Sequence, residues 1–383
     1  MDSLSEMRPL RVVVVGAGVA AIETCLALRA LASTRVQLTL VCPDQWYESK
    51  PAAVGEPFGV AAVRRFDLDR IAADLGAKRV HGTASSVEAD QKRVLVDGRH
   101  PVDYDALVLA CGATPVGAVP GAVTFAGPRD VPLVRAVIDE IATGEATRLV
   151  FAVPSNVGWT MPLYELALLS ARHLADRGAR RSLAIVSPEP SPLPAFGAAA
   201  SREVGDLLEH WEVAFHGQRT PIEFRDGELR TSPSGVVPAD RVLALARLRG
   251  VRIDGVPVDS DGLVRTDMFG RVDDLPDVYA AGDITAFPIK QGGIATQQAD
   301  SVASTIATDA GADVPPHPFE PVLRGLLMTG EGERYLSSHI TGGSGETSAV
   351  ETEPAWWPPV KIPGRYLGPY LAGIAGVPEP ADS

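Results

Sequence analysis

The chain has 383 residues, of which 45% are hydrophobic and 22% are charged, a composition ordinary for a globular protein of two or three domains. Lysine and arginine number 35 against 48 aspartates and glutamates, so the net charge is −13 and nucleic acid is not an expected partner. The first residues lack the apolar core of a signal peptide, and no apolar run reaches the ~20 residues of a transmembrane segment, so we expect a cytosolic protein.

The first 45 residues predict a β-α-β unit. "RVVVVGAG" is a continuous apolar run typical of a buried parallel strand, "AAIETCLALRALA" has helical spacing, and "RVQLTLVCPD" is a second strand. Gly16 and Gly18 lie in the turn between strand and helix, where a backbone can approach a pyrophosphate, and Ala21 allows close helix–strand packing. The alternative is a plain glycine-rich turn in a β-α-β fold.

The same design recurs at about 148–190. "RLVFAVPSN" predicts a buried strand, "LYELALLSARHLADRG" an amphipathic helix and "RRSLAIVSPEP" the next strand. Between the two units, residues 78–115 contain short alternating runs that predict an antiparallel excursion, after which "YDALVLACGATP" returns a strand to the first sheet. "DRVLALARL" and "DLPDVYAAGDI" predict later strands, and the tail beyond about 311 reads as a separate small region.

Residues 278–307 are the second stretch with a chemical signature. An apolar strand ends in Gly282 and Asp283, and a loop with Lys290 leads through a glycine pair into a long helix. A carboxylate at the end of a strand can accept hydrogen bonds from sugar or ribityl hydroxyls. The start of a helix stabilises a group that gains negative charge, as the N1–C2=O region of a reduced flavin does.

Three motifs, "VVVVGAGVAAIE", "LVLACGATP" and "VYAAGDITAFPIKQGGIATQQAD", resemble the FAD-binding signatures of the pyridine nucleotide–disulfide oxidoreductase superfamily. The resemblance is greatest to the branch of type II NADH dehydrogenases and sulfide:quinone oxidoreductases. It implies an α/β protein with two Rossmann-like domains, the first interrupted by the second. The expected divisions are 1–120 and 247–310 for the FAD domain, 121–246 for the inner domain and 311–383 for a C-terminal interface segment.

The resemblance also implies which residues hold a permanently bound FAD. Gly16, Gly18 and Ala21 correspond to the pyrophosphate loop, Val80 to the adenine contact and Gly282–Asp283 to the ribityl pair. The remaining positions lie along the isoalloxazine ring or at the crossing of the chain beneath it: Lys50, Pro51, Ala110, Cys111, Gly112, Lys290, Gln291 and Gly292.

The sequence departs from the superfamily in three places. Cys42 stands where an acid usually holds the adenosine ribose, and Asp44 follows two residues later. The inner loop "AVPSNVGWTMPLYELA" retains only Gly158 and carries bulky side chains, so we do not expect NAD(P)H in its usual pose; the inner unit as scaffold alone is an equal alternative. The third departure concerns the cysteines: no pair has dithiol spacing, and none lies beyond Cys111. We interpret Cys111 as a small buried hydrophobic residue in preference to a catalytic thiol.

Two features keep alternative interpretations. Lys290 is either a catalytic group that stabilises charge on the flavin or a solvated surface lysine. The aromatic segment "EPAWWPPVKIPGRYLGPYLAG" (353–373) could pack across a homodimer contact, which we favour, cover the flavin, line an acceptor site or lie peripherally on a membrane. The seven histidines lack metal-ligand spacing, and no metal site is expected.

These patterns predict an FAD-dependent oxidoreductase that moves two electrons from a small-molecule donor to an acceptor such as a quinone, without a catalytic disulfide. The first alternative is an NAD(P)H-dependent reductase with an atypical nicotinamide site. The second is a flavin-binding protein with little turnover.

Overall fold

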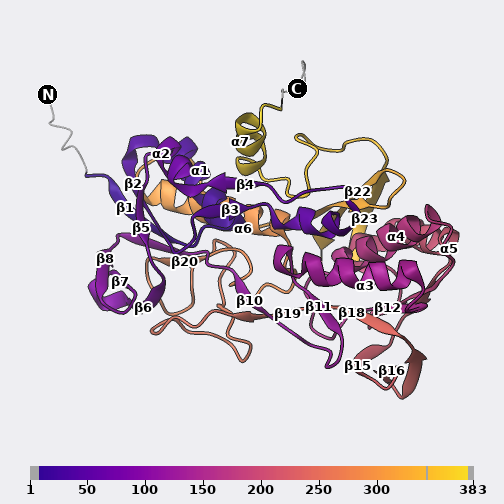
Figure 1. Cartoon of the computed structure of the whole chain (residues 1–383). Coiled ribbons are helices and arrows are strands. Elements are labelled where there is room, and N and C mark those ends of the chain that lie inside the picture. The colour runs from indigo at the N-terminus through magenta and orange to yellow at the C-terminus, as the bar shows by residue number, and fades with distance from the viewer. Residues whose placement is uncertain (1–7, 342–343, 378–383) are drawn as a thin grey trace, which may run out of the picture.

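Two parallel sheets form the frame of the protein in the computed structural model, which describes residues 8–341 and 344–377 (Figure 1). The first sheet has the order β20-β9-β1-β2-β5. Its strands are β1 (Leu10–Val15), β2 (Val36–Cys42), β5 (Lys78–His81), β9 (Ala106–Leu109) and β20 (Val278–Ala280). All neighbours are parallel, so residues far apart in sequence end at one edge of this sheet.

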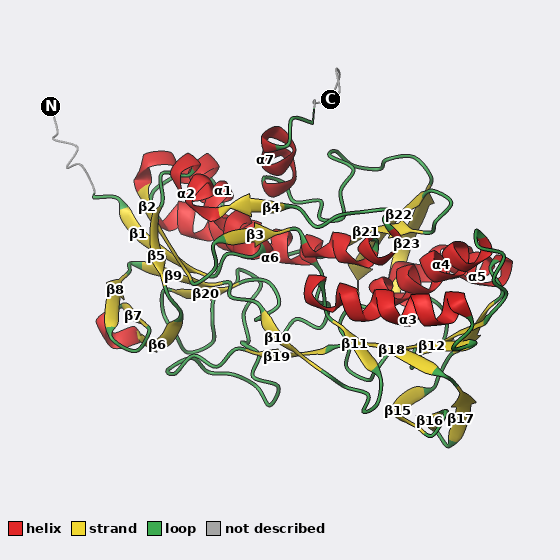
Figure 2. Ribbon diagram, viewed as in Figure 1, coloured by secondary structure: helices red, strands yellow, loops and turns green. Residues whose placement is uncertain are grey.

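The second sheet has the order β11-β18-β12-β13-β14 and lies beside the first. Its strands are β11 (Val123–Phe125), β12 (Arg148–Ala152), β13 (Ser182–Val186), β14 (Val213–His216) and β18 (Arg241–Leu245). Figure 2 shows α3 (Val131–Thr143), α4 (Met161–Ala175) and α5 (Gly197–His210) over one face. The other face packs against a small antiparallel sheet of β15 (Thr220–Arg225), β16 (Glu228–Ser232) and β17 (Gly235–Pro238).

The predicted antiparallel excursion is present as β6 (Ala84–Glu88), β7 (Arg93–Val96) and β8 (His100–Asp103). Two antiparallel ribbons complete this part of the fold: β3 (Trp46–Glu48) with β4 (Arg65–Asp67), and β10 (Ala113–Val116) with β19 (Arg247–Gly250). The short helix α2 (Leu68–Asp74) precedes β5. Strand β10 follows β9 of the first sheet and β19 follows β18 of the second. This ribbon therefore joins the two halves of the molecule, one built on the first sheet and the other on the second sheet.

Helices α1 (Val19–Ala32) and α6 (Gly292–Asp309) pack against one another on the first sheet. Small residues of both helices lie close to Gly282: a Cβ on Gly282 would lie 3.0 Å from Ala20 of α1 and 3.6 Å from Ala295 of α6. The close packing fixes the start of both helices near the ends of β1 and β20. Among the described residues, every helix is too short or too polar to cross a bilayer.

The C-terminal region is not the separate small region that the sequence suggested. Strands β21 (Val322–Met328), β22 (Glu333–Thr341) and β23 (Ser344–Glu351) form an antiparallel sheet, and α7 (Leu367–Ile374) follows. This sheet lies on α4 and α5, while Glu23 of α1 accepts hydrogen bonds from the backbone N–H groups of Tyr366 and Leu367. The tail therefore bridges both halves of the protein.

Helix α4 is buried on nearly all sides, which corrects the amphipathic pattern expected for it. Leu163, Leu166 and Leu174 are buried as predicted, and Tyr164, Glu165 and the two other leucines of the helix are buried as well. The second apolar side is covered by β21, which packs on α4 from a position more than 150 residues later in the chain. Helical periodicity cannot reveal such a partner.

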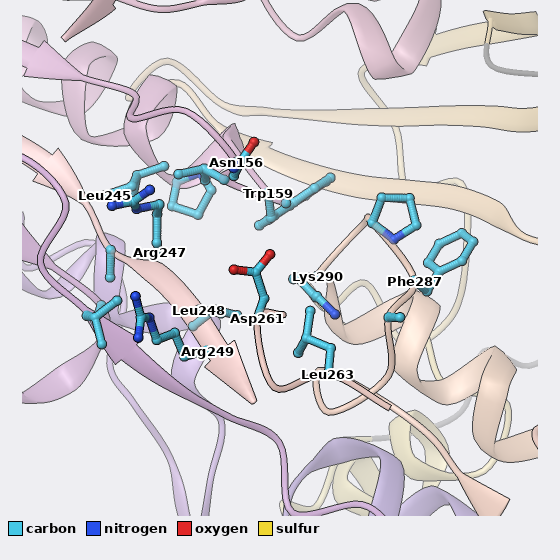
Figure 3. Close-up of a pocket in the computed structure, with 18 of the residues that line it drawn as sticks. Asn156, Trp159, Leu245, Arg247, Leu248, Arg249, Asp261, Leu263, Phe287 and Lys290 are labelled. Atoms are coloured by element: carbon cyan, nitrogen blue, oxygen red, sulfur yellow. The ribbon is translucent and has the colours of Figure 1, made fainter. Parts of the chain in front are cut away.

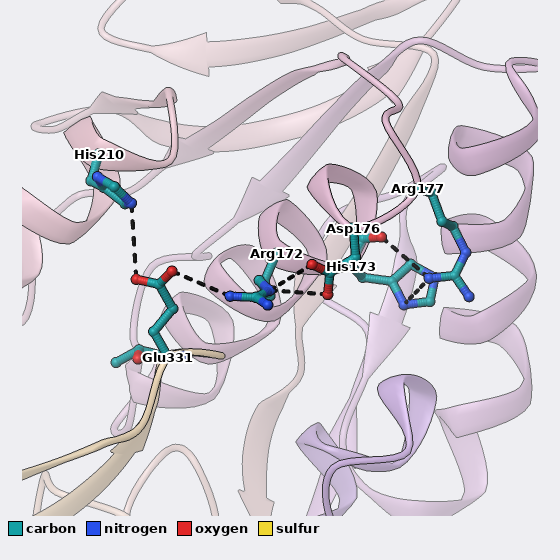
Figure 4. Close-up of polar contacts among 7 residues, drawn as sticks. Arg172, His173, Asp176, Arg177, His210 and Glu331 are labelled. Atoms are coloured by element: carbon teal, nitrogen blue, oxygen red, sulfur yellow. Dashed lines mark hydrogen bonds and ion pairs between the residues drawn. The ribbon is translucent and has the colours of Figure 1, made fainter.

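Polar contacts attach the β21–β22 turn to the second half of the molecule (Figure 4). Arg172 of α4 donates to Asp176 at 2.9 Å and to Glu331 in the turn at 3.2 Å. His210, at the end of α5, lies 3.9 Å from the same Glu331 carboxylate. These groups are largely exposed, so they orient the turn and contribute little stability.

Candidate functional site

The carboxyl ends of β1, β9 and β20 bring the three sequence motifs together. Gly16 follows β1 with φ +116°, and its N–H donates to Val41 at 2.8 Å. A Cβ on Gly16 would lie 2.3 Å from the carbonyl oxygen of Ala110, which follows β9. Only glycine fits this crossing, because it needs both a positive φ and a direct backbone approach.

Gly18 faces open space at the start of α1. A Cβ there would meet nothing within 4 Å, and no side chain caps the helix, so the first N–H groups of α1 are available to a ligand. Ala21, in contrast, is fully buried and packs the helix onto the sheet. The turn thus offers an uncapped helix N-terminus to an anionic group, as a pyrophosphate requires.

Gly282 and Asp283 lie at the same edge, after β20. Gly282 has φ +83°, and its N–H donates to Gln298 Oε1 of α6 at 2.8 Å. The carboxyl of Asp283 is half-buried, and burial raises its pKa while Lys290 and Lys50 act in the opposite direction. A partly desolvated carboxyl beside two cations suits hydrogen bonds from ligand hydroxyl groups.

Lys290 is held in the loop before α6 and is not a solvated surface lysine. Its ammonium group donates to the backbone carbonyls of Asp283, at 3.2 Å, and Thr285. Burial lowers its pKa, and the carboxylates of Asp283 and Asp259 oppose this change. The charge of Lys290 is therefore directed to the edge where Asp283 lies.

Gln291 and Gly292 form the start of α6. The Gln291 side chain accepts from the N–H of Ile294 at 2.9 Å and donates to the carbonyl of Arg324 in β21 at 2.8 Å. A Cβ on Gly292 would lie 2.8 Å from Ile362. The Gln291 side chain thus caps the helix and ties it to the C-terminal sheet, and Ile362 covers its first turn.

The residues proposed for the adenosine end lie at the far edge of the sheet. Cys42 is buried at the end of β2, Asp44 is exposed two residues later, and Val80 lies in β5 beside Val41. Sequence reasoning missed Arg79, whose guanidinium donates to the Asp44 carbonyl and pairs with Asp69. The only signal for Arg79 in the sequence was its position next to Val80, the residue predicted to contact adenine.

Residues 50 and 51 begin a short 3₁₀ helix, Lys50–Val54, after β3. Lys50 is exposed and acts electrostatically on Asp283, while Pro51 is partly buried. The segment after the second strand thus returns to the edge that carries Gly282. Cys111 and Gly112, after β9, are partly exposed at the same edge, and a Cβ on Gly112 would meet nothing within 4 Å.

Burial makes the thiols poor nucleophiles. It raises the pKa of Cys25 to about 12 and that of Cys111 to about 11, and it also raises the pKa of Cys42. A protonated thiol is neither a nucleophile nor a metal ligand. No cluster of three or more metal-ligating side chains exists in the part of the chain that the structure describes.

The inner loop differs most from a dinucleotide site. The carbonyl of Gly158 accepts from the N–H of Lys290 at 3.1 Å, and a Cβ on Gly158 would lie 2.4 Å from the carbonyl oxygen of Pro288. Trp159 packs edge-on against Phe196 with ring centroids 5.7 Å apart. The loop is thus closed against residues 288–290 of the other half.

Glu189 is a second obstacle, and sequence reasoning missed it. Its carboxylate accepts from Thr160 Oγ1, Tyr164 OH and Ser187 Oγ at 2.7–2.8 Å. Thr160 precedes α4, so an acidic side chain lies at the helix start where a Rossmann-type unit binds a pyrophosphate. Burial raises the pKa of Glu189 and the three hydroxyl donors lower it.

Comparison with known proteins supports the superfamily resemblance. Residues 164–300 match the family model described as pyridine nucleotide-disulphide oxidoreductase. No curated protein sequence matches the chain.

Solved structures share the fold at low sequence identity. The sulfide:quinone oxidoreductase from the hyperthermophilic bacterium Aquifex aeolicus has a TM-score of 0.81 at 20% identity, covering 89% of this chain and 86% of that one. The ferredoxin reductase for the CYP199A2 system from Rhodopseudomonas palustris has 0.63 at 17%, covering 87% and 83%. The water-forming NADH oxidase from Lactobacillus brevis has 0.61 at 16%, covering 86% and 75%. The chain therefore has the α/β fold of the pyridine nucleotide-disulphide oxidoreductases, and its residues 164–300 carry the sequence pattern of that family.

Proposed function

We propose that this chain is an oxidoreductase with non-covalently bound FAD, which passes two electrons from a small-molecule donor to an acceptor such as a quinone. The observation that carries the proposal is the convergence of the Gly16–Gly18 turn, the 110–112 crossing and the Gly282–Asp283 pair at one edge of the first sheet. In open parallel sheets, ligands bind at this edge.

The residues fit the cofactor along its length. The uncapped start of α1 beside Gly18 suits the pyrophosphate, and Asp283 suits the ribityl hydroxyls. Lys290 and the start of α6 would face the ring system, where they would stabilise negative charge that builds up on it. FAD supplies the redox chemistry, and the protein binds it, orients it and excludes water.

A catalytic disulfide is not part of the proposal. The three cysteines are distributed over α1, β2 and the segment after β9, and burial keeps Cys25 and Cys111 protonated at neutral pH. A quinone acceptor is suggested by the name of the Aquifex aeolicus protein and by the similarity of its fold. Glu189 and the closed Gly158 loop argue against an NAD(P)H donor in the usual pose.

Contacts of the aromatic C-terminal segment favour one of the roles considered for it, that of a cover over the flavin. Ile362 packs against Gly292, and Trp356 packs edge-on on Tyr335 at 4.9 Å and donates to the carbonyl of Val360 at 2.9 Å. These contacts lie within one chain. They support a role for this segment as a cover over the ring end of the cofactor site, and packing across a homodimer contact is the alternative.

The test separates cofactor binding from folding. Gly18→Val places a side chain into open space at the helix start, so it should leave the melting temperature near that of the parent and weaken FAD binding at least about tenfold. The visible spectrum and flavin titration of the refolded apoprotein measure this. Gly16→Val is the matched control, since its clash with Ala110 should lower stability itself. A correctly folded parent protein that takes up no FAD would refute the proposal.

Stopped-flow kinetics test which donor reduces the flavin. Rapid anaerobic reduction of the flavin by NADH or NADPH would favour the NAD(P)H-dependent alternative. A flavin that no donor reduces would favour a binding protein with little turnover.

A further inference from the structure

A cavity of about 520 Å³ lies between the two halves of the protein. Phe125, Asn156 and Leu245 border it at the carboxyl ends of the second sheet, and the loop 286–290 borders it from the first half (Figure 3). This volume lies within the ~300–1,000 Å³ range of small-molecule sites. Of the residues proposed to contact FAD, only Lys290 lines this cavity.

Two arginines on one strand give the cavity its charge. Arg247 and Arg249 are two residues apart on β19, so their side chains share a face, and both line the cavity. Figure 3 shows them across the space from Lys290 and Phe287. Within residues 8–341 and 344–377, neither guanidinium has an ion pair or hydrogen bond to the protein. Guanidinium groups are suited to binding carboxylates through two parallel hydrogen bonds.

Two acidic residues, Asp259 and Asp261, also line the cavity, and neither forms an ion pair with Arg247 or Arg249. Asp259 accepts from the backbone N–H groups of Asp261 and Leu263, both at 2.9 Å, so its carboxylate is engaged in a turn. Asp261 is exposed, and Figure 3 shows its carboxylate in the space between Arg247 and Lys290, without an ion pair to a described residue. Lys290 lines the cavity opposite the arginines, while its ammonium group donates to the carbonyls of Asp283 and Thr285.

The remaining walls are apolar and aromatic. Trp159, Leu263 and Phe287 line the cavity, and Phe196 fixes the Trp159 ring edge-on. Such walls accept a hydrophobic body while the arginines hold a charged end. A dinucleotide does not suit the same space, because Glu189 lies at the start of α4 and the Gly158 loop is closed onto Pro288 and Lys290.

We propose that this cavity binds a small organic carboxylate with an apolar or aromatic body, whose carboxylate pairs with Arg247 and Arg249. Lys290 lines the cavity and also contacts the carbonyl of Asp283, so the bound anion lies next to the ring end of the cofactor site. Binding of this anion does not rest on the proposed oxidoreductase function.

The experiment uses benzoate as the probe and benzamide as its uncharged counterpart, each titrated calorimetrically into the purified protein. Benzoate should bind at least about tenfold more tightly than benzamide, and Arg247→Gln/Arg249→Gln should remove this preference. Asp261→Asn removes a carboxylate that lines the cavity and should strengthen benzoate binding. Arg252→Gln is the matched control, because Arg252 follows the same strand but pairs only with Asp254 at the surface, and it should change nothing.

Equal binding of the two probes, or unchanged benzoate binding in the folded double variant, would overturn the proposal. Displacement of benzoate by stoichiometric NADH would also overturn it, because the cavity would then be a nicotinamide site. The visible spectrum of the same samples keeps the two proposals apart. A colourless protein that still binds benzoate refutes the FAD proposal alone, and a yellow protein that does not refutes the cavity proposal alone.

Discussion

The carbonyl of Gly158 accepts a hydrogen bond from the backbone N–H of Lys290 at 3.1 Å, and this contact joins the two halves of the protein beside the cavity. Gly158 follows β12 of the second sheet, while Lys290 precedes α6 of the first half. The contact requires the absence of a side chain at residue 158, because a Cβ would lie 2.4 Å from Pro288 O and 2.7 Å from Lys290 Cγ.

Gly158→Ala should therefore lower the free energy of unfolding by about 1–3 kcal/mol, as overpacking does elsewhere. It should also weaken FAD binding, since the loop must move with Lys290. Denaturant unfolding and flavin titration measure the two effects. Gly205→Ala in α5 is the matched control: its Cβ meets nothing within 4 Å, so helix propensity should raise stability by about 0.5–1 kcal/mol. Equal stability of the two variants would contradict the close contact.

The thiols should be unreactive in the native protein. Only the thiolate attacks a disulfide reagent, and burial raises the pKa of Cys25 to about 12 and that of Cys111 to about 11. We expect native protein at neutral pH to react with a chromogenic disulfide far more slowly than the urea-unfolded chain, which should titrate all three cysteines. Cys111→Ser should leave the rate of flavin reduction within about twofold of the parent. Rapid reaction of the native protein, or a large rate loss in Cys111→Ser, would restore a thiol to the mechanism.

The sequence alone predicted those strands and helices whose hydrophobic pattern is local. The buried strands β1, β2, β12 and β13 are continuous apolar runs and lie where that pattern predicted them. The convergence of Gly16 with Gly282 also followed from motif order, since parallel strands end at a common edge. The ranges predicted for the domains, and the roles predicted for the site residues, stay predictions.

Contacts made by side chains from distant segments could not be predicted. Glu189 lies three residues beyond the end of β13, and its inward orientation depends on Thr160 and Tyr164. The pairing of Lys361 with Glu165 spans 196 residues and has no local signal. The cavity arginines depend on how β10 and β19 pair, a register that single-strand patterns do not fix.

A pair of carboxyl groups should make stability depend on pH. Burial and the neighbouring Glu23 carboxylate raise the pKa of Asp300 from 3.8 to about 8, with Arg365 opposing. Between about pH 4 and about pH 8, the native state holds a proton that the unfolded chain has released, so the free energy of unfolding should fall as pH rises and level off above the native pKa. Asp300→Asn removes this proton and should flatten the curve over the same interval.

Urea unfolding across that pH interval measures the effect. Asp254→Asn is the control, because it removes a carboxyl group that is exposed at the surface. Parallel curves for the parent and Asp300→Asn would show that the Asp300 carboxyl is ionised in the native state. Since Glu23 also accepts from the N–H groups of Tyr366 and Leu367, the protection factors of these amides, taken against the intrinsic exchange rate at each pH, should fall in the parent as pH rises.

The buried ion pair between Glu165 and Lys361 should be the strongest polar tie between α4 and the C-terminal segment. The Glu165 side chain is 1% exposed, and its carboxylate also accepts from the N–H of Met328 at 2.9 Å. Lys361→Met would leave this charge without its partner, which typically lowers the free energy of unfolding by about 3–5 kcal/mol. Glu165→Gln/Lys361→Met removes both charges and should recover a large part of the loss. Denaturant unfolding of the two variants, compared with Arg252→Gln at a surface pair expected to be worth about 0–1 kcal/mol, gives the measurement. A double variant no more stable than Lys361→Met would mean that packing of the lysine stem, and not its charge, secures the segment over α4.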